Sequence, residues 1–425
     1  MNGARGEGSA SDEPHSAKTA SAASARSRAT ASSAPLTGLR VLDLGTRIAA
    51  PFCAGLLGEM GAEVIKIEQP GAGDFMREIG PFVDDYSLFW SVEGRGRRSV
   101  TLDLRKPEGQ DICRRLAATC DVVVENFRPG TLERWHIAPG DLDDRLVVVR
   151  ISTFGQDGPL ASRPGLDRVG IGYGGLMHLT GYPDRPPVRV GVTLSDYLTG
   201  VFASNAAVAA LYKRDARGGD GAVIDACLYG AVLRILEWTL AAYDQLGVVR
   251  SREGNRLANS APLDNYPTAD AKYVCIVAGS DANFSRLCKA MGRTELIDDE
   301  RFARLADRAE RSDEINEIVA AWTRSLPATE VEAACVEHDV PVATAYTAID
   351  IFNDAHMAAR GDLVTVDDPV LGPVRQQAPF PRFVGSSPVV PSGAPALGVD
   401  TRDVLSSALG IDDAELDRLA AQGVT

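Results

Sequence analysis

The first half of the chain alternates short apolar runs with segments of helical periodicity. Apolar runs of strand length cover residues 40–44, 63–67, 100–104, 121–125 and 146–150. Between them, residues 51–60 and 107–118 carry apolar side chains at helical spacing, and Pro107 suits the first turn of a helix. Nearly continuous apolar strands that alternate with helices are typical of a parallel sheet covered on both faces. The pattern therefore predicts an α/β fold with a Rossmann-like parallel sheet.

The second half of the chain predicts long helices followed by a smaller mixed unit. Residues 194–213 and 221–246 are Ala-rich and helical in pattern. Further expected elements are a strand at 272–278, helices at 284–291 and 314–325, extended segments at 364–367 and 372–383, and closing helices at 401–409 and 412–421. We therefore expect a smaller α+β domain that long linkers join to the Rossmann-like one.

The expected domain organisation begins with a tail that does not fold. Residues 1–34 contain no Val, Leu, Ile, Phe, Tyr or Trp, so they bury too little apolar surface to offset the entropy of ordering. They also lack the apolar stretch of a secretory signal. The expected boundaries are 1–34 for the disordered Ala/Ser-rich tail, 35–212 for the large domain completed by 385–425, 213–249 for linker helices, 250–345 for the small domain and 346–384 for a return linker.

Composition excludes several classes of protein. The chain has 44 Lys and Arg against 58 Asp and Glu, a net charge of -14, which argues against nucleic acid as a partner. No run of residues is apolar for the ~18 positions that a membrane helix needs, so we expect no membrane insertion. An acidic protein can still contain a basic pocket, so anionic small molecules remain open as ligands.

Cysteine and histidine usage predicts a reduced protein without a resident metal. The seven cysteines are scattered and never adopt Cys-x-x-Cys spacing, which is typical of buried thiols in a cytoplasmic protein. The five histidines form no metal-ligand pattern. We expect cytoplasmic localisation and no metal site.

Residues 170–175 spell Gly-x-Gly-x-x-Gly, the spacing of the dinucleotide-binding fingerprint. That fingerprint follows the first strand of a sheet and opens a helix, but no predicted strand leads into residue 170. We expect instead a flexible glycine loop that lines a pocket, formed by Gly172, Gly174 and Gly175. The chain also lacks the phosphate-binding P-loop pattern and the Gly-x-Ser-x-Gly pattern of α/β-hydrolases.

Two further features have a structural and a functional interpretation. Arg95, Arg97 and Arg98 form either a solvated turn or a clamp for phosphate or pyrophosphate, which the planar guanidinium group suits. Asp196 stands at the expected start of a long helix, where the helix dipole favours an acidic residue by ~0.3–1 kcal/mol. The same dipole is expected to keep the carboxylate ionised near neutral pH, as a carboxylate nucleophile requires.

Taken together, these segments resemble the class III CoA-transferases, the CaiB/BaiF family. The resemblance spans residues 35–425, and its motifs lie at residues 35–43, 57–68, 98–104, 121–130, 154–159, 175–177 and 192–200. It implies that the domain over 35–212 binds coenzyme A. It also implies an interlocked homodimer and an acyl-CoA and a carboxylic acid as substrates, with no permanently bound cofactor.

The resemblance implies the chemistry of Asp196. In that family the corresponding Asp attacks the acyl-CoA thioester to give a mixed anhydride, which free CoA converts to an aspartyl-CoA thioester. The expected activity is transfer of CoA from a donor, such as succinyl-CoA or another dicarboxylyl-CoA, to a second carboxylic acid. The glycine loop is expected to stabilise the oxyanions.

Residues that match the family's CoA-contact positions are also implied by the resemblance. They are Arg47, Ile48, Ala49, Gln69, Arg97, Arg98, Leu102, Asn126, Phe127 and Arg134. For Leu102 and Phe127, ordinary core packing is an equally good interpretation. Gln69 stands where some members carry Arg, and Gly94 where an Asn is common, so the resemblance leaves the details of the CoA contact open at these two positions.

Two alternative functions remain open from the sequence. An α-methylacyl-CoA racemase would use Asp196 with Asp167, but the His that precedes the Asp in that branch is Leu166 here, so one base is absent. A non-catalytic CoA-binding protein is the other alternative. For a dicarboxylic substrate, Arg163 and Arg189 are either partners of the distal carboxylate or surface charges.

Overall fold

The computed structural model describes residues 34–384 and 390–425. The tail expected over residues 1–34 lies outside the described residues except for Ala34. Six strands form the large sheet: β1 (Arg40–Asp43), β2 (Glu63–Glu68), β5 (Arg97–Thr101), β6 (Val122–Glu125), β7 (Val147–Ser152) and β8 (Ala222–Cys227).

The six strands are all parallel to their neighbours, in the order β5-β2-β1-β6-β7-β8. The central strand β1 aligns Leu42 with Ile65 of β2 on one side and with Val123 of β6 on the other. This confirms the predicted α/β fold built on a parallel sheet.

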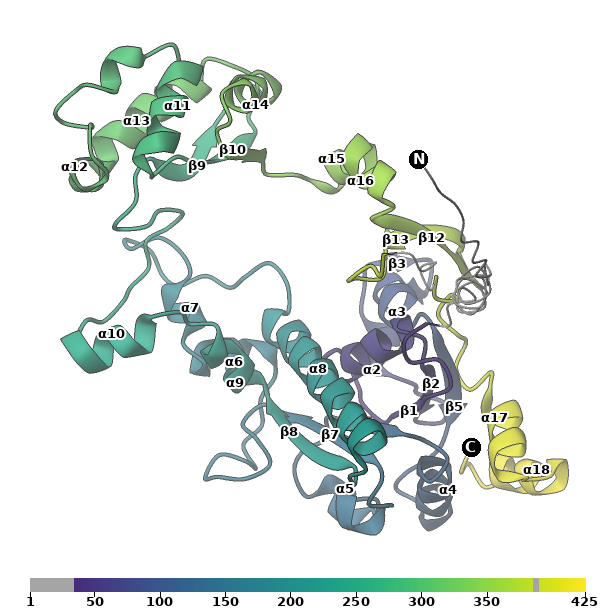
Figure 1. Cartoon of the computed structure of the whole chain (residues 1–425). Helices are drawn as coiled ribbons and strands as arrows, with labels where there is room; N and C mark the ends of the chain where they lie inside the picture. The colour runs from purple at the N-terminus through teal and green to yellow at the C-terminus, as the bar shows by residue number, and fades with distance from the viewer. Residues whose placement is uncertain (1–33, 385–389) are drawn as a thin grey trace, which may run out of the picture.

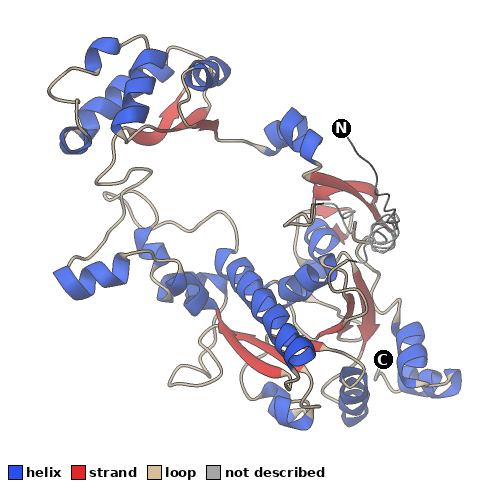
Figure 2. Ribbon diagram, viewed as in Figure 1, coloured by secondary structure: helices blue, strands red, loops and turns tan. Residues whose placement is uncertain are grey.

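Helices cover both faces of the large sheet (Figure 2). On one face, Leu42 and Ile65 belong to the cluster of buried side chains that includes Leu116 of α4 (Pro107–Ala117) and Leu405 of α17 (Thr401–Leu409). On the other face, Val41 packs in the cluster of α2 (Ala49–Glu59) and α8 (Leu194–Arg217). Alternate residues of β1 thus supply two separate cores, and α17 with α18 (Asp413–Ala421) packs on the large sheet.

One predicted helix is partly a strand. Residues 221–246 were expected to be helical throughout, but residues 222–227 form β8, and helices follow only as α9 (Leu228–Arg234) and α10 (Thr239–Leu246). The Ala content suggested a helix, whereas the β-branched pair Val223 and Ile224 pairs with Val148 and Val149 of β7. The large sheet therefore extends beyond residue 212, where linker helices were expected to begin.

The smaller unit has its own sheet and core. Its antiparallel strands are β9 (Leu263–Pro267), β10 (Tyr273–Val277) and β11 (Val342–Thr344). Buried side chains of α11 (Asp281–Ala290), α13 (Ser312–Thr323) and α14 (Ala328–Glu337) join them in one cluster. Figure 1 shows that the chain enters this unit by one segment and returns by another. The return passes through α15 (Ala348–Asn353), α16 (Ala355–Arg360), β12 (Leu363–Asp368) and β13 (Gly372–Gln377).

Shorter elements complete the large unit. They are α3 (Leu88–Glu93), α5 (Thr131–Arg134), α6 (Asp167–Tyr173), α7 (Leu176–Leu179) and the two-residue strands β3 (Phe82–Val83) and β4 (Tyr86–Ser87). Of these, α6 borders the site described next.

Candidate active site

The loops that follow β1, β6 and β7 meet at one edge of the large sheet. The chain runs from β1 outward to β2 and β5, and then crosses to β6, β7 and β8 on the opposite side of β1. In open parallel sheets, ligands bind beyond the carboxyl ends of the strands at such a reversal of strand order. Thr46, Asn126 and Ser152 stand at or just after these strand ends.

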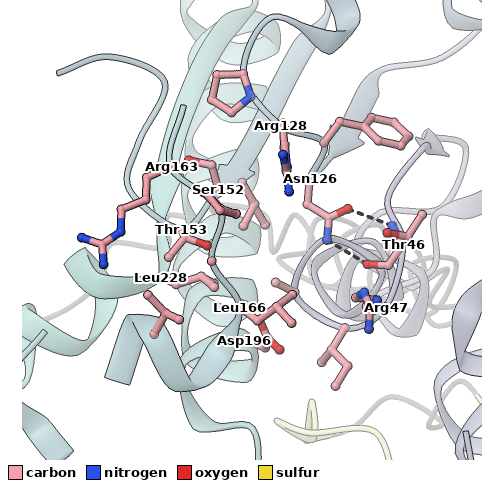
Figure 3. A pocket seen from close by; sticks show the side chains of 18 of the residues that line it. Thr46, Arg47, Asn126, Arg128, Ser152, Thr153, Arg163, Leu166, Asp196 and Leu228 are labelled. Carbon is pink, nitrogen blue, oxygen red and sulfur yellow. Dashed lines mark hydrogen bonds between the residues drawn. The ribbon is translucent and has the colours of Figure 1, made fainter. Parts of the chain in front are cut away.

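A cavity of about 610 Å³ opens at this point. Figure 3 shows the side chains that line it, with Asp196 projecting from the first turn of α8. The cavity brings together Asp196 and several residues implied as CoA contacts, namely Arg47, Ile48, Ala49, Asn126 and Phe127. Its size is that of a small-molecule site.

The start of α8 is fixed by a carboxylate from α6. Asp167 Oδ1 accepts hydrogen bonds from the Ser195 N–H and the Ser195 hydroxyl, both at 2.8 Å, and from the Asp196 N–H at 3.4 Å. Asp167 and Ser195 are both buried. The first-turn N–H groups of α8 are thus bound by a neighbouring helix, which fixes the direction in which Asp196 leaves α8.

Asp196 does not have the pKa that the helix start predicts. Burial and then the charge of Asp167 raise the pKa of Asp196 to about 7, while the Arg47 guanidinium opposes them. We expected the helix dipole to keep this carboxylate ionised near neutral pH, but burial and the neighbouring charge outweigh the dipole. Asp196 therefore exchanges its proton near neutral pH.

Side chains from two other segments of the chain hold the loop that carries Arg47. The Asn126 side chain accepts from the Thr46 N–H and donates to the Thr46 carbonyl, both at 2.8 Å. Asp74 accepts from the Arg47 N–H at 3.1 Å, and Arg47 has a φ of +66°. The Arg47 guanidinium lies 4.0 Å from the centre of the Phe75 ring. These contacts hold a left-handed conformation that a non-glycine residue rarely adopts.

A second cavity, of about 320 Å³, adjoins the first. The two cavities share Thr46 and Phe127. Gln69 and Leu102 line the second cavity, and so does Trp135, whose ring contacts Phe127 edge to face at 5.0 Å between centroids. Sequence reasoning implied Gln69 and Leu102, but it missed Trp135.

Arg97 and Arg98, implied as CoA contacts and interpreted as part of either a solvated turn or a phosphate clamp, line neither cavity. Arg97 is 5% exposed, and its guanidinium binds Asp43 at 3.4 Å and the carbonyls of Glu93 and Pro51. Arg98 points to the other face of β5 and pairs with Glu63 at 2.9 Å and with Asp403. Both arginines carry structural ion pairs because the strand begins at residue 97 rather than at residue 100.

Two other arginines of the sequence predictions also lie elsewhere. Arg134, implied as a CoA contact, lines neither cavity and donates to the Thr131 hydroxyl at 3.0 Å. Arg95, the third member of the expected clamp, pairs with Glu59 at 2.6 Å. Neither guanidinium faces the cavities.

The expected glycine loop is a pair of helices. Gly172 lies inside α6, and Gly174 ends that helix. A Cβ atom on Gly174 would stand 2.7 Å from Val232 Cβ, so the absence of a side chain lets α6 pack closely on α9. Gly175, with a φ of +92°, begins α7. None of the three lines the two cavities, and the prediction of a flexible pocket loop is wrong.

Several residues of the site were not expected from the sequence. Arg128 and Thr153 line the first cavity, as do Thr46 and Ser152. All four follow or end a strand of the sheet, so the positions after β1, β6 and β7 could have identified them. Within residues 34–384 and 390–425 no cluster of His, Cys, Asp and Glu could hold a metal ion. In the same ranges no helix is long and apolar enough to span a bilayer.

Comparison with known proteins identifies relatives of this chain. The family model described as CoA-transferase family III matches residues 36–401. A succinyl-CoA–D-citramalate CoA-transferase of Chloroflexus aurantiacus is 41% identical over 394 residues, which are 92% of this chain and 98% of the relative. The β subunit of a succinyl-CoA–L-malate CoA-transferase of the same organism is 38% identical over 402 residues, 93% of this chain and 99% of the relative.

A solved structure has the same fold. The crystal structure of a CaiB/BaiF family protein from Brucella suis superposes with a TM-score of 0.79 at 31% sequence identity. The match covers 89% of this chain and all of that one. The α/β architecture with the six-stranded parallel sheet is thus shared with that protein.

Proposed function

Because the chain belongs to CoA-transferase family III, we propose that it transfers CoA from succinyl-CoA to a second carboxylic acid, with Asp196 as the nucleophile. The chain is an enzyme that moves CoA between an acyl-CoA and a carboxylate, as its relatives are. The observation that carries the proposal is the position of Asp196, a half-buried carboxylate at the edge of a cavity that adjoins a second one.

The proposed reaction begins with attack of an Asp196 carboxylate oxygen on the thioester carbon. The carbon–sulfur bond breaks, which leaves a mixed anhydride and the CoA thiolate. The thiolate then attacks the Asp196 carbonyl carbon and releases succinate, giving an aspartyl-CoA thioester. The acceptor carboxylate and the released thiolate repeat the two steps in reverse order, which forms the new acyl-CoA and regenerates Asp196. Covalent steps of this kind replace one difficult exchange by several easier ones.

The two adjoining cavities suit the two ends of CoA. We assign the nucleotide end to the cavity of Gln69 and Leu102, and the thioester end to the cavity of Asp196. The connection runs past Thr46 and Phe127, which line both. Arg47, Ile48, Ala49 and Asn126 border this path. The positive charge of Arg47 opposes the rise in the pKa of Asp196, and in this proposal it also stabilises the negative charge that develops on the attacked carbonyl.

The pKa of Asp196 leads to a pH prediction. With a pKa of about 7, Asp196 is ionised in only part of the molecules at neutral pH, so the transfer rate should rise between pH 6 and pH 8. Asp167→Asn removes the neighbouring negative charge but leaves the burial, so the pKa of Asp196 should fall. The pH at which the transfer rate rises should then be lower by roughly one unit than in the unmodified protein. An unchanged pH dependence in this variant would mean that Asp167 does not set the ionisation of Asp196.

The test of the proposed activity is mass spectrometry of the full-length protein with succinyl-CoA and a panel of carboxylic acids in D2O. We expect a new acyl-CoA in the absence of ATP. Deuterium at the α-carbon of a branched acyl-CoA, with no new thioester, would contradict the proposal in favour of a racemase. If neither product forms but calorimetry detects CoA binding, the chain is a CoA-binding protein without transferase activity.

An interlocked homodimer is the assembly that we propose. Large apolar side chains of the segment around α10 are exposed in the single chain, among them Trp238, Tyr243, Leu246 and Val249. A group of large exposed apolar side chains in one segment supports an interaction surface there. The chain leaves for the small unit and returns from it by two separate segments (Figure 1), and we propose that a second copy passes between them.

A further inference from the structure

The charges of the Asp196 cavity are unusual for an acidic chain. Among the residues that line the cavity, three are arginines and Asp196 is the one carboxylate. The chain as a whole has a net charge of -14. A cavity with surplus positive charge attracts anions even within an acidic protein. A monocarboxylic acid would use only one of these charges.

Two of the three arginines, Arg47 and Arg163, already have partners for their guanidinium groups. The Arg47 guanidinium stacks on Phe75 and acts on Asp196 itself. The Arg163 guanidinium lies 5.5 Å from the centre of the Phe154 ring. In Figure 3 it extends away from Asp196. The aromatic rings of Phe75 and Phe154 therefore account for where these two guanidinium groups lie.

Arg128 differs from both. In the part of the chain that the structure describes, no carboxylate, carbonyl or aromatic ring pairs with its guanidinium. Its backbone is fixed, because the Phe127 N–H donates to Glu125 at 2.7 Å and the Arg128 carbonyl accepts from the Thr131 N–H at 3.0 Å. In Figure 3 its guanidinium is directed from the end of β6 toward the interior of the cavity. A rigidly placed backbone thus presents a charge without a partner.

We propose that Arg128 binds the distal carboxylate of a dicarboxylic acyl group and so selects dicarboxylic over monocarboxylic acids. This inference rests on the proposed function, since it places the reacting carbonyl at Asp196. The planar guanidinium can form two parallel hydrogen bonds to a carboxylate. The hydroxyls of Ser152 and Thr153 line the same cavity and can bind polar groups between the two carboxylates.

The Arg128 guanidinium is exposed to solvent, and the selection follows from the ion pair that only a dicarboxylic acid can form with it. A dicarboxylic acid brings a charge that Arg128 neutralises, whereas a monocarboxylic acid of the same length leaves the guanidinium without an anion. A charge-assisted hydrogen bond that is made with one substrate and not the other corresponds to a preference of roughly 10- to 100-fold. The preference should appear in the step at which the free acid binds and reacts.

The experiment compares two symmetric exchange reactions in the full-length protein. One exchanges isotope-labelled succinate with succinyl-CoA, and the other exchanges labelled butyrate with butyryl-CoA, both followed by mass spectrometry. Both reactions use Asp196 in the same way, and only succinate has a distal charge. In Arg128→Met we expect kcat/KM for succinate exchange to fall by roughly 10- to 100-fold. Butyrate exchange should change less than about threefold, and Arg128→Lys should recover part of the loss because it keeps the charge.

Two matched variants and one binding measurement keep the test specific. Arg168→Met removes an exposed charge of α6 that lines neither cavity, and it should leave the ratio of the two rates unchanged. The inference is overturned if Arg163→Met rather than Arg128→Met lowers that ratio, or if Arg128→Met slows both exchanges equally. It is also overturned if this variant weakens binding of free CoA, measured by calorimetry, by the same factor. Failure of the proposed function itself looks different, because the unmodified protein would then exchange neither acid.

Discussion

Replacing Asp196 by asparagine is expected to abolish CoA transfer, with a loss of at least about 10³-fold in kcat. The amide has nearly the shape of the carboxylate, but it cannot form the anhydride or the aspartyl-CoA thioester. Steady-state transfer from succinyl-CoA measures the loss. Intact-mass spectrometry of the unmodified protein should show an adduct of the mass of CoA less one water, as an aspartyl-CoA thioester requires, and this adduct should be missing in Asp196→Asn.

The stability of this variant separates lost chemistry from lost folding. The pKa of Asp196 is raised in the folded protein to about 7, so the folded state holds this proton more tightly than the unfolded state does. Ionisation of Asp196 therefore lowers stability as the pH rises from about 4 to 7, and an asparagine avoids that loss. Asp196→Asn should thus melt at the same temperature as the unmodified protein, or a higher one, at pH 8.

The matched control for this variant lies at the other end of the same helix. Asp220 is exposed just after α8, and Asp220→Asn should retain full transfer activity. Full activity in Asp196→Asn, with no CoA adduct in the unmodified protein, would contradict the proposed mechanism.

The sequence predicted the parts of the fold that depend on local pattern. The strands around Leu42, Ile65 and Val123 are short and apolar between helical segments, so their order in the chain was enough to predict a parallel sheet. β8 was missed because it is an edge strand with alternate half-buried and exposed residues in an Ala-rich segment. Its strand pairing with β7 decides its conformation, and that pairing depends on residues far away in the sequence.

The sequence identified Asp196 at the centre of the candidate site, but it did not predict the charged groups around that residue. Asp196 was identified from its place at a helix start and from the family motif. Its pKa was not predicted, because burial and the Asp167 charge come from tertiary packing. Arg97 was assigned to ligand binding because a cluster of arginines in an acidic chain suggests an anion. The structure instead uses Arg97 to neutralise the buried Asp43.

The buried Asp43 belongs to a network of ion pairs with Lys66 and Asp74, next to the loop that carries Arg47. Lys66 is 1% exposed, and its Nζ lies 2.7 Å from the Gly45 carbonyl, 3.0 Å from Asp74 and 3.6 Å from Asp43. Burial alone would lower the pKa of Lys66, but the carboxylates around it raise the pKa overall. Burial alone would raise the pKa of Asp74, but Lys66 and nearby N–H donors lower it. Both groups are therefore charged, and the network joins β1, β2 and the loop that borders both cavities.

Lys66→Met is therefore expected to destabilise the large unit by about 3–5 kcal/mol, because it leaves the buried carboxylate of Asp74 without its cation, whereas Asp43 keeps its pairing with Arg97. Urea unfolding followed by circular dichroism measures the loss. The deficit should be smaller at pH 5 than at pH 8, since an unpaired buried carboxylate gains stability when it takes up a proton. Lys66→Met with Asp74→Asn should recover part of the loss, and Lys213→Met, which removes an exposed lysine of α8, should cause none. If Lys66→Met unfolds at the same urea concentration as the unmodified protein at pH 8, the network does not support the loop.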